Sequence, residues 1–313
     1  MKRILILVCF VFIIGCSAQK EQLSTQNSYT FTDDLGQQVT VSSPKRVAAL
    51  IGSFADMWYL SGGEVIASAD DAWDDFDLPM PENAVNIGKT KAPSLEKIFQ
   101  ADPDFIIASG STRANLEMRE TLYAAKIPTA YFNVSDFEDY LRVLKIFTDI
   151  NNRPDLYQKN GLNIADEMEK VILHSKQRIE KSGKAPKVLL IRASSSNIYV
   201  KNSENNVAGE MLKNLGCENI ADSDSSLLEN LSLERIMQAD PDYIFVLQFG
   251  DDRTAMENFL SQNLFSHPAW QQLSAVRENR VYYLEKQLYS LKPNEKWAQA
   301  LGGIERILTD EAV

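Results

Sequence analysis

The sequence predicts an α/β fold of two similar lobes that a single long α-helix joins. Three observations predict it. Short aliphatic runs alternate with amphipathic segments over most of the 313 residues, which is typical of parallel sheets covered by helices on both faces. One fourteen-residue stretch occurs twice, as SLEKIFQADPDFII at 94–107 and as SLERIMQADPDYIF at 232–245, with ten identical positions. A long helical pattern lies between the two copies.

The first residues have the pattern of a leader. After the basic start MKR come twelve residues without a charge, fewer than the roughly 20 needed to cross a bilayer, so 1–15 is predicted to be a secretion signal. Ile13-Ile14-Gly15-Cys16 is similar to the lipobox of bacterial lipoproteins, in which Cys16 would become the lipidated N-terminus. Residues 16–28 would then be a flexible tether. An ordinary signal that happens to contain a cysteine is the alternative.

Residues 29–150 are predicted to form an N-terminal Rossmann-like lobe. Aliphatic and β-branched runs indicate strands, and amphipathic stretches indicate helices between them. The expected strands lie at 46–50, 65–69, 105–109 and 129–133, and the expected helices at 94–101, 116–126 and 137–150.

Residues 151–184 are predicted to be the connecting helix. Apolar residues recur at near-helical spacing from 155 to 182 with charged residues between them, and Gly183 and Pro186 follow as stop signals. A rigid helical connector differs from the flexible linkers that usually join independent domains. We therefore expect it to fix the two lobes across a cleft with little hinge motion.

Residues 185–313 are predicted to form a C-terminal lobe of the same kind. Strands are expected at 187–193, 243–249 and 280–285, separated by helices at 209–216, 232–239, 254–262 and 295–310.

The repeated stretch predicts one helix, turn and strand in each lobe. Ser94 is a plausible N-cap, as is Ser232 in the second copy, and Pro103 and Pro241 stop the two helices. The residues at i, i+3 and i+4 predict an apolar stripe that packs on a sheet. These stripes are Leu95, Ile98 and Phe99 in the first copy and Leu233, Ile236 and Met237 in the second.

Composition excludes several functions. With 43 acidic against 32 basic residues the net charge is −11 and no basic stripe occurs, so nucleic-acid binding is not expected. Cys217 has apolar neighbours and is expected to be a buried, unreactive thiol. The sequence contains no phosphate loop, no G-x-S-x-G elbow and no H-E-x-x-H helix, and it has only two histidines. We therefore expect no enzyme activity.

Two α/β lobes, a helical connector and a lipoprotein signal together resemble the substrate-binding proteins of bacterial ABC importers, in the branch that captures ferric siderophores, haem and cobalamin. The matching stretches span nearly the whole mature chain. They are GQQVTVSSPKRVAAL, both copies of the repeat, AGEMLKNLGCENIAD, HPAWQQLSAVRENRVYYLE and KPNEKWAQAL.

The resemblance implies a monomeric extracytoplasmic protein held to a membrane by lipid, which delivers a metal chelate to an ABC permease dimer with a cytoplasmic ATPase. In that family a rim glutamate on each lobe docks onto permease arginines, and the motif match assigns this role to Glu96 and Glu234. The alternative is that both are first-turn carboxylates that favour the helix dipole.

Candidate ligand contacts come from the loops that follow the strands, because ligands of open α/β sheets bind at the carboxyl ends of strands. Aromatic residues would form rigid walls, and cations would neutralise an anionic chelate. Core packing or a solvated surface charge is the alternative for each. The candidates are Trp73, Arg113, Arg192, Tyr199, Phe249, Tyr289 and Lys292.

A protein-bound metal is not expected. Direct Zn or Mn sites normally use several histidines, and only His174 and His267 exist. His267 could be an axial ligand of haem or cobalt, but its position in FSHPAW favours a turn residue that caps the following helix. Met57, Met80 and Tyr289 are further candidate haem ligands, and the aspartates around Trp73 could face a cationic ligand or form a solvated loop.

The sequence leaves the chelate open. A ferric siderophore or haem is expected, with a corrinoid as the alternative, and no cofactor is expected besides this cargo. A lipoprotein adhesin with the same fold, or an enzyme, remains a rival from another class.

Overall fold

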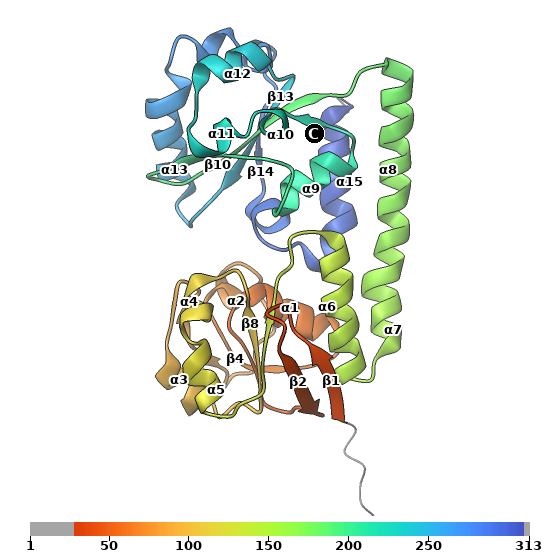
Figure 1. Ribbon diagram of the computed structural model, residues 1–313, viewed down its shortest axis with the longest axis vertical. Coiled ribbons are helices and arrows are strands. Elements are labelled where there is room, and N and C mark those ends of the chain that lie inside the picture. The colour runs from red at the N-terminus through yellow and green to blue at the C-terminus, as the bar shows by residue number, and fades with distance from the viewer. Residues whose placement is uncertain (1–27, 310–313) are drawn as a thin grey trace, which may run out of the picture.

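The computed structural model describes residues 28–309, and it confirms the predicted fold class (Figure 1). The N-terminal lobe is built on a five-stranded sheet in the order β5-β4-β3-β8-β9, in which every neighbouring pair is parallel. Its strands are β3 (Val47–Ala49), β4 (Val65–Ser68), β5 (Val85–Asn86), β8 (Phe105–Ser109) and β9 (Thr129–Phe132).

The C-terminal lobe is built on a second sheet in the order β11-β10-β13-β14, with β12 also paired to β10. Its pairs are parallel except β10 with β11. The strands are β10 (Lys187–Ala193), β11 (Ile198–Lys201), β12 (Glu218–Asn219), β13 (Tyr243–Gln248) and β14 (Val281–Leu284). The antiparallel β11 falls in a segment that the sequence analysis placed in a loop.

Helices lie on the faces of both sheets, as continuous apolar strands require (Figure 1). Those of the N-terminal lobe are α1 (Gly52–Leu60), α2 (Asp71–Asp74), α3 (Leu95–Gln100), α4 (Arg113–Glu117), α5 (Arg119–Ala124) and α6 (Phe137–Ile150). Those of the C-terminal lobe are α9 (Val207–Asn214), α10 (Ile220–Ser223), α11 (Ser226–Glu229), α12 (Leu233–Ala239), α13 (Arg253–Leu260), α14 (Ser274–Arg277) and α15 (Trp297–Leu308). Two π-turns, Ser261–Phe265 and Lys286–Ser290, and two 3₁₀ turns, Trp270–Gln272 and Asn294–Lys296, complete this lobe.

The connector is continuous but not a uniform α-helix. It begins with α7 (Pro154–Tyr157), passes through a π-turn at Gln158–Leu162 and continues as α8 (Asn163–Ser182), which Gly183 ends in a left-handed conformation with φ 69°. Figure 1 shows α8 running beside both lobes, with α15 packed against it in the C-terminal lobe. The π-turn is a local widening of the helix that the periodicity of apolar residues did not predict.

The two copies of the repeat start in the same way. Ser94 Oγ accepts a hydrogen bond from the Lys97 backbone N–H at 3.3 Å, and Ser232 Oγ accepts from Arg235 at 3.5 Å. Both serines are therefore the N-caps that the sequence predicts, at the first turn of α3 and of α12.

The two copies also end in the same way. The carboxylate of Asp104 accepts from the Arg46 backbone N–H at 2.9 Å, just before β3, and that of Asp242 accepts from the Lys187 N–H at 2.8 Å, at the start of β10. Each aspartate thus joins the start of its strand to the start of the neighbouring parallel strand. This contact explains why the ADPD turn occurs once per lobe.

The predicted apolar stripe is wrong at one position in each copy. Ile98 and Ile236 are fully buried, whereas Phe99 is 39% exposed and Met237 is 38% exposed. The helices are only six and seven residues long, so one leucine and one isoleucine already cover the sheet. The next side chain lies about 100° further around the helix axis and faces away.

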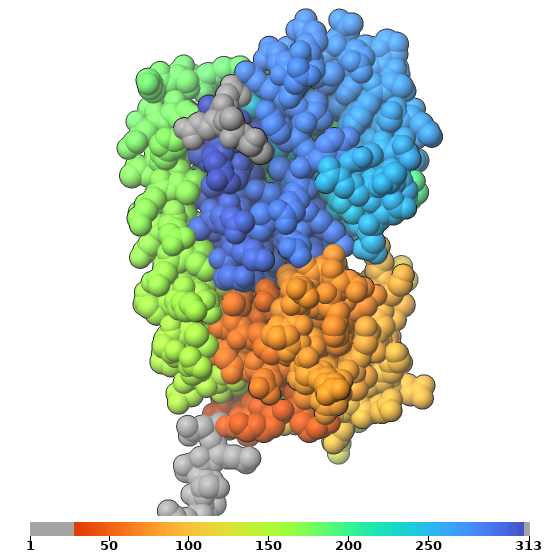
Figure 2. Space-filling model, turned by 180° about the vertical axis from the view of Figure 1, so that it is seen from behind, coloured from red at the N-terminus to blue at the C-terminus, as the bar shows by residue number. Residues whose placement is uncertain are grey.

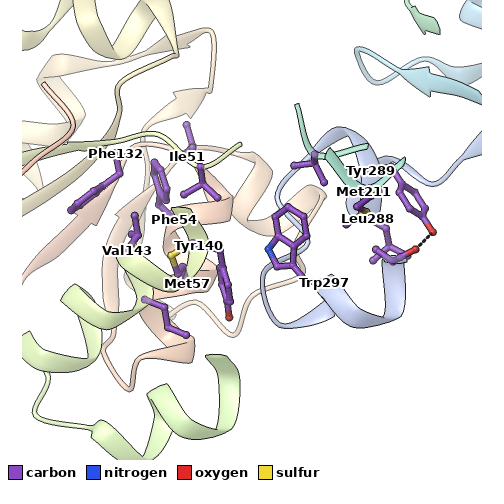
Figure 3. Close-up of a cluster of buried hydrophobic side chains, with 14 of the residues drawn as sticks. Ile51, Phe54, Met57, Phe132, Tyr140, Val143, Met211, Leu288, Tyr289 and Trp297 are labelled. Atoms are coloured by element: carbon purple, nitrogen blue, oxygen red, sulfur yellow. Dashed lines mark hydrogen bonds between the residues drawn. The ribbon is translucent and has the colours of Figure 1, made fainter. Parts of the chain in front are cut away.

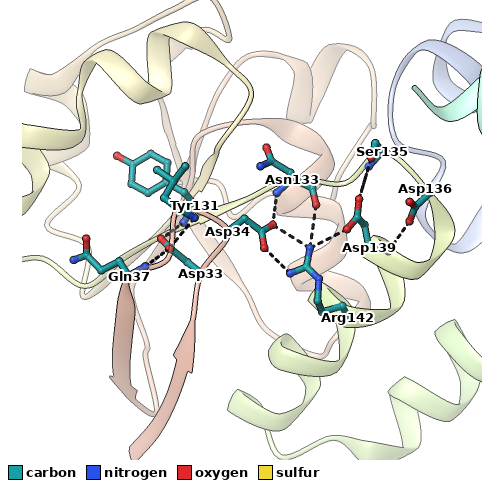
Figure 4. Close-up of polar contacts among 10 residues, drawn as sticks. Asp33, Asp34, Gln37, Tyr131, Asn133, Ser135, Asp136, Asp139 and Arg142 are labelled. Atoms are coloured by element: carbon teal, nitrogen blue, oxygen red, sulfur yellow. Dashed lines mark hydrogen bonds and ion pairs between the residues drawn. The ribbon is translucent and has the colours of Figure 1, made fainter. Parts of the chain in front are cut away.

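An N-terminal hairpin, β1 (Ser28–Thr32) with β2 (Gln38–Ser42), covers the edge strand β9 (Figure 4). Asp33 Oδ2 accepts from the Tyr131 backbone N–H at 3.0 Å, and Asp34 accepts from the Asn133 N–H at 2.6 Å. Arg142 of α6 pairs with Asp34 at 2.8 Å. These contacts occupy the edge of the sheet, which would otherwise expose unpaired backbone groups.

The lobes share one hydrophobic core. A single cluster of buried side chains extends from β3, α1 and α6 of the first lobe to α9 and α15 of the second (Figure 3). The ring of Trp297 lies 5.8 Å from that of Phe137, and the Tyr140 hydroxyl donates to the Asn160 carbonyl at 2.6 Å. Figure 2 shows the C-terminal lobe seated directly on the N-terminal lobe. Packing of this kind limits the movement of one lobe against the other.

Among residues 28–309 no helix is long and apolar enough to span a bilayer. The predicted signal, Cys16 and most of the tether lie outside the described residues. Cys217 is the free cysteine of the described part, and burial raises the pKa of its thiol to about 12. It therefore carries almost no thiolate at neutral pH, as expected for an unreactive thiol.

Candidate functional site at the lobe junction

The carboxyl ends of the N-terminal strands face a segment of the C-terminal lobe, residues 286–296. α1 follows β3 and contacts this segment, and α2 follows β4 and is followed by Asp75, which also contacts it. The Asn294 side-chain N–H donates to the Ser53 carbonyl at 2.9 Å, and the Lys286 ammonium lies 2.8 Å from the Asp75 carboxylate. The junction is therefore formed at the sheet edge where open α/β proteins bind ligands.

The space enclosed at the junction is small. A cavity of about 80 Å³ is lined by residues of both lobes, which are Asp56, Phe76, Gln287, Lys292, Pro293, Glu295 and Lys296. Sites for drug-sized ligands measure about 300–1,000 Å³. The facing loops are thus closed against one another around this cavity, which is smaller than such sites.

Phe249 lies between two cations from opposite lobes. The Arg192 guanidinium of β10 is 4.0 Å from the centre of its ring, and the Lys91 ammonium is 4.3 Å from the same centre. Lys91 belongs to the turn of the hairpin β6 (Gly88–Lys89) and β7 (Ala92–Pro93) in the N-terminal lobe. Each contact is a cation–π interaction of about 0.5–2 kcal/mol, so together they close this side of the junction.

Positive charge at Arg192 is not neutralised by protein carboxylates. Arg192 forms no ion pair with any described residue, and Tyr199, opposite it on β11, is 51% exposed. Burial lowers the pKa of Arg192, and it also lowers that of Lys201, which the charge of Arg192 lowers further. Two neighbouring cations without a counter-ion form a site that favours an anion.

Lys286 bridges the lobes. Its ammonium lies 2.8 Å from Asp75 of the N-terminal lobe and 2.9 Å from Asp251 of its own lobe, and the Gln287 side chain donates to the Asp75 carbonyl. The two carboxylates raise the pKa of Lys286 above its ordinary value, although burial opposes them. The bridge therefore joins the two lobes at the edge of the junction.

Lys292 lies in a poorly solvated position at the junction. Its ammonium is 5.1 Å from the centre of the Phe54 ring, and burial lowers its pKa to about 8, while Asp71 opposes that shift. Burial raises the pKa of Asp71 to about 6, and its Oδ1 is buried without a hydrogen-bond partner. Lys292 therefore carries a charge that an anionic ligand would stabilise.

Asp56 lies beside Asn294, whose side-chain N–H donates to its Oδ2 at 2.7 Å. Burial and, to a smaller extent, the Glu295 carboxylate raise the pKa of Asp56 to about 7, although Asn294 and Lys296 oppose the shift. Asp56 is therefore partly protonated at neutral pH.

Replacing Asp56 with Asn changes how stability depends on pH. The folded pKa of about 7 lies above the ordinary 3.8, so the contribution of Asp56 is fully present below about pH 4 and is lost as pH rises through 7. Asp56→Asn should unfold at the same temperature as the unaltered protein at pH 4 and at a higher temperature at pH 8. Thermal melts across this range measure the difference.

Asp166→Asn is the matched control, because Asp166 is exposed on α8 far from the junction. It should leave the melting curve unchanged at both pH values. Equal melting of Asp56→Asn and the unaltered protein at pH 8 would contradict the burial of a charge at this site.

The structure brings three of the predicted ligand contacts together, Arg192, Tyr199 and Phe249, and it places Lys292 at the same junction. Trp73 is half-buried on α2, against the shared core. Arg113 begins α4 at the carboxyl edge of the first sheet, where its side chain is 92% exposed and pairs with Glu117 at 2.7 Å.

Tyr289 lies elsewhere than the sequence analysis expected. It is 7% exposed in the shared core, and its hydroxyl donates to the Ala300 carbonyl at 2.9 Å. A π-turn at Lys286–Ser290 rotates this side chain inward, which the loop-like sequence did not indicate. Tyr289 is therefore not available as a wall or as a metal ligand.

The other candidate metal ligands are committed to protein contacts. His174 Nδ1 lies 3.2 Å from Glu305 on the far side of the molecule, and His267 Nδ1 accepts from the Ala269 N–H at 3.1 Å, so His267 caps a turn. Met57 is fully buried, and the Met80 sulfur accepts from a tyrosine hydroxyl at 3.7 Å. Within residues 28–309 no group of three or more His, Cys, Asp or Glu could hold a metal ion.

Lys91, Lys286 and Asn294 were missed by sequence reasoning. Each has a role only because residues far apart in the chain meet across the junction. The one available signal was the polar KPNEK segment beside a conspicuous tryptophan, Trp297.

Glu96 and Glu234 occupy equivalent exposed positions in the first turns of α3 and α12. Neither forms an ion pair with a residue that the structure describes. The adjacent cations are engaged elsewhere, since Lys97 donates to a carbonyl at 3.0 Å and Arg235 pairs with Asp224 at 2.6 Å. The two carboxylates are thus free to meet a partner.

Comparison with known proteins identifies the family of this chain. Residues 47–288 match the model of the periplasmic binding protein family. The chain belongs to this family. The resemblance inferred from the repeat and the two lobes is therefore confirmed.

Similar periplasmic binding proteins include two from Bacillus subtilis. The iron-uptake system-binding protein is 25% identical over 291 residues, covering 89% of this chain and 88% of the relative. The Fe(3+)-citrate-binding protein YfmC is 26% identical over 296 residues, covering 92% of this chain and 89% of the relative.

Solved structures show the same fold. Staphylococcus aureus SirA in complex with staphyloferrin B matches with a TM-score of 0.69 and 19% identity, covering 90% of this chain and 98% of that one. Staphylococcus aureus IsdE in complex with haem matches with a TM-score of 0.66 and 16% identity, covering 84% and 98%.

Proposed function

We propose that this chain is an extracytoplasmic binding lipoprotein of an ABC importer that captures an anionic ferric chelate between its lobes. The chelate is of the citrate or carboxylate-siderophore class. The protein binds this cargo without transforming it, acts as a monomer, and hands it to a membrane permease dimer that a cytoplasmic ATPase drives. Lipid on Cys16 holds it at the membrane surface.

The observation that carries the ligand class is the unneutralised positive charge at the junction. Arg192 lies beside Lys201, Lys91 of the other lobe contacts the same Phe249 ring, and none of the three cations forms an ion pair with a described residue. Because the Asp251 carboxylate acts on Lys91, Arg192 and Lys201 carry the charge that lacks a counter-ion. Carboxylates of a ferric chelate would supply the missing counter-charge through charge-assisted hydrogen bonds. The exposed ring of Tyr199 would pack against its carbon skeleton.

Haem and corrinoids are less well supported. Of the side chains considered as axial ligands, His267, Met57, Met80 and Tyr289 all make other contacts. Two relatives that each cover about nine tenths of this chain are named for iron uptake and Fe(3+)-citrate, which agrees with a ferric carboxylate chelate.

Docking to the permease is assigned to Glu96 and Glu234, one per lobe. The two glutamates occupy the same position in the two copies of the repeat. Each of two equivalent partner subunits would therefore contact a glutamate in the first turn of a short helix.

Uptake of radioactive iron tests the proposal. A strain that lacks the gene should take up iron from ferric citrate or a carboxylate siderophore at background rate, and the gene supplied on a plasmid should restore uptake. Growth on haem as the iron source should not change. Unchanged uptake from every ferric chelate in the deletion strain would refute the proposal.

A further inference from the structure

Each copy of the repeat exposes one large apolar side chain beside its glutamate. Phe99 follows Glu96 by three residues on α3, and Met237 follows Glu234 by three residues on α12. Side chains at i and i+3 are neighbours on a helix surface. Each lobe therefore presents a carboxylate and an apolar side chain next to one another.

Packing within the lobes does not account for these two side chains. The leucine and isoleucine of each helix cover the sheet, whereas Phe99 is 39% and Met237 is 38% exposed. Exposure of one large hydrophobic residue is ordinary on a protein surface. Its recurrence at the same position of the repeat, in the same exposed orientation and beside the same unpaired carboxylate, is not explained by chance exposure.

We infer that Phe99 and Met237 form, with Glu96 and Glu234, two matched contact points for the two subunits of the permease. The inference rests on the proposed function and adds to it an apolar component of docking. Each permease subunit would present an apolar depression next to the cation that pairs with the glutamate.

The charge and the positions of these side chains favour the permease over a lipid surface as the partner. A lipid surface with anionic headgroups would repel the two glutamates, so membrane insertion of the apolar side chains is disfavoured. Figure 1 shows α3 and α12 on different lobes and well separated from α8. A partner that contacts both must therefore span the junction, as a symmetric pair of subunits does. Aromatic and methionine side chains are enriched at such interfaces.

The test replaces both apolar side chains, Phe99→Ser with Met237→Ser, in the full-length protein. Its affinity for the purified permease–ATPase complex in proteoliposomes should fall by about tenfold to a hundredfold, since truncation of a central contact residue has effects of this size. Ferric citrate binding and the melting temperature should stay unchanged. Surface plasmon resonance measures the affinity for the permease–ATPase complex. Tryptophan fluorescence measures ferric citrate binding and the melting temperature.

The matched control is Leu162→Ser with Leu173→Ser, which removes two exposed leucines from the connecting helix. It should leave the affinity for the permease unchanged. Unaltered affinity of the Phe99/Met237 variant would overturn the inference. If Glu96→Lys with Glu234→Lys still abolishes binding in that case, the proposed function stands and only the apolar contact is refuted.

A second copy of this chain is the competing occupant of the same surface. Sedimentation of the unaltered protein should show a monomer at the concentrations used. A dimer that the Phe99/Met237 variant dissociates would assign the surface to self-association and would overturn the inference.

Discussion

Charge reversal of Glu96 and Glu234 together should abolish uptake of the ferric chelate, while the purified protein should keep its affinity for the ligand. Both glutamates are exposed and unpaired among the described residues, so neither contributes to the fold beyond a favourable first-turn charge of about 0.3–1 kcal/mol. Lysine at these positions would place like charges against the permease, which costs several kcal/mol at an interface. Cellular uptake of radioactive iron and ligand titration of the purified variant measure the two quantities separately.

Glu167→Lys with Glu169→Lys provides the matched control, because it makes the same change of charge on the exposed face of α8. Uptake should remain at the level of the unaltered protein. A Glu96/Glu234 variant that still transports iron would contradict the docking role, and one that fails to bind ligand would show a structural defect instead.

Replacing Arg192 with Gln should weaken binding of ferric citrate by about tenfold to 150-fold. Loss of one hydrogen bond to a charged group removes about 1.5–3 kcal/mol, and each 1.4 kcal/mol corresponds to a factor of ten. Arg192 lies half-buried over the Phe249 ring, where screening by solvent is incomplete. Tryptophan fluorescence titrations at several salt concentrations measure the affinity for ferric citrate. This affinity should depend less on salt in the variant than in the unaltered protein.

Arg306→Gln is the control for this change. Arg306 is exposed on α15, on the side that packs against α8 and away from the junction. It should bind ferric citrate as the unaltered protein does. Equal affinities of the Arg192 and Arg306 variants would place the anion elsewhere.

The architecture was predictable from the sequence because its strands are continuous aliphatic runs and because the repeat marks one unit per lobe. Runs such as 105–109 and 187–193 are fully apolar or nearly so, and each forms a strand of a parallel sheet. The edge strand β11 was missed because it is short and follows a serine-rich turn, so no apolar run marks it. Edge strands are less constrained by burial than central strands.

The candidate site was predictable only in part. Arg192, Tyr199 and Phe249 were chosen because the sequence puts them at or beyond the end of a predicted strand; the structure brings them together, and their ligand contact stays a prediction. Lys91 and Lys286 were not, since their partners are supplied by the other lobe and no local pattern records such a pairing. The exposure of Phe99 could not be predicted from the apolar spacing either. Each residue lies about 100° further around the helix axis, so on a short helix a neighbouring position can face either the core or the solvent.

Titration of the purified mature protein with ferric citrate, haem and cyanocobalamin under one set of conditions tests whether the lobes bind an anionic ferric chelate. We expect saturable quenching of tryptophan fluorescence by ferric citrate, or by another carboxylate ferric chelate, with one complex bound per chain. We expect no saturable binding of haem or cyanocobalamin. Saturable binding of haem with a Soret band, or no binding of any ferric chelate, would contradict this expectation.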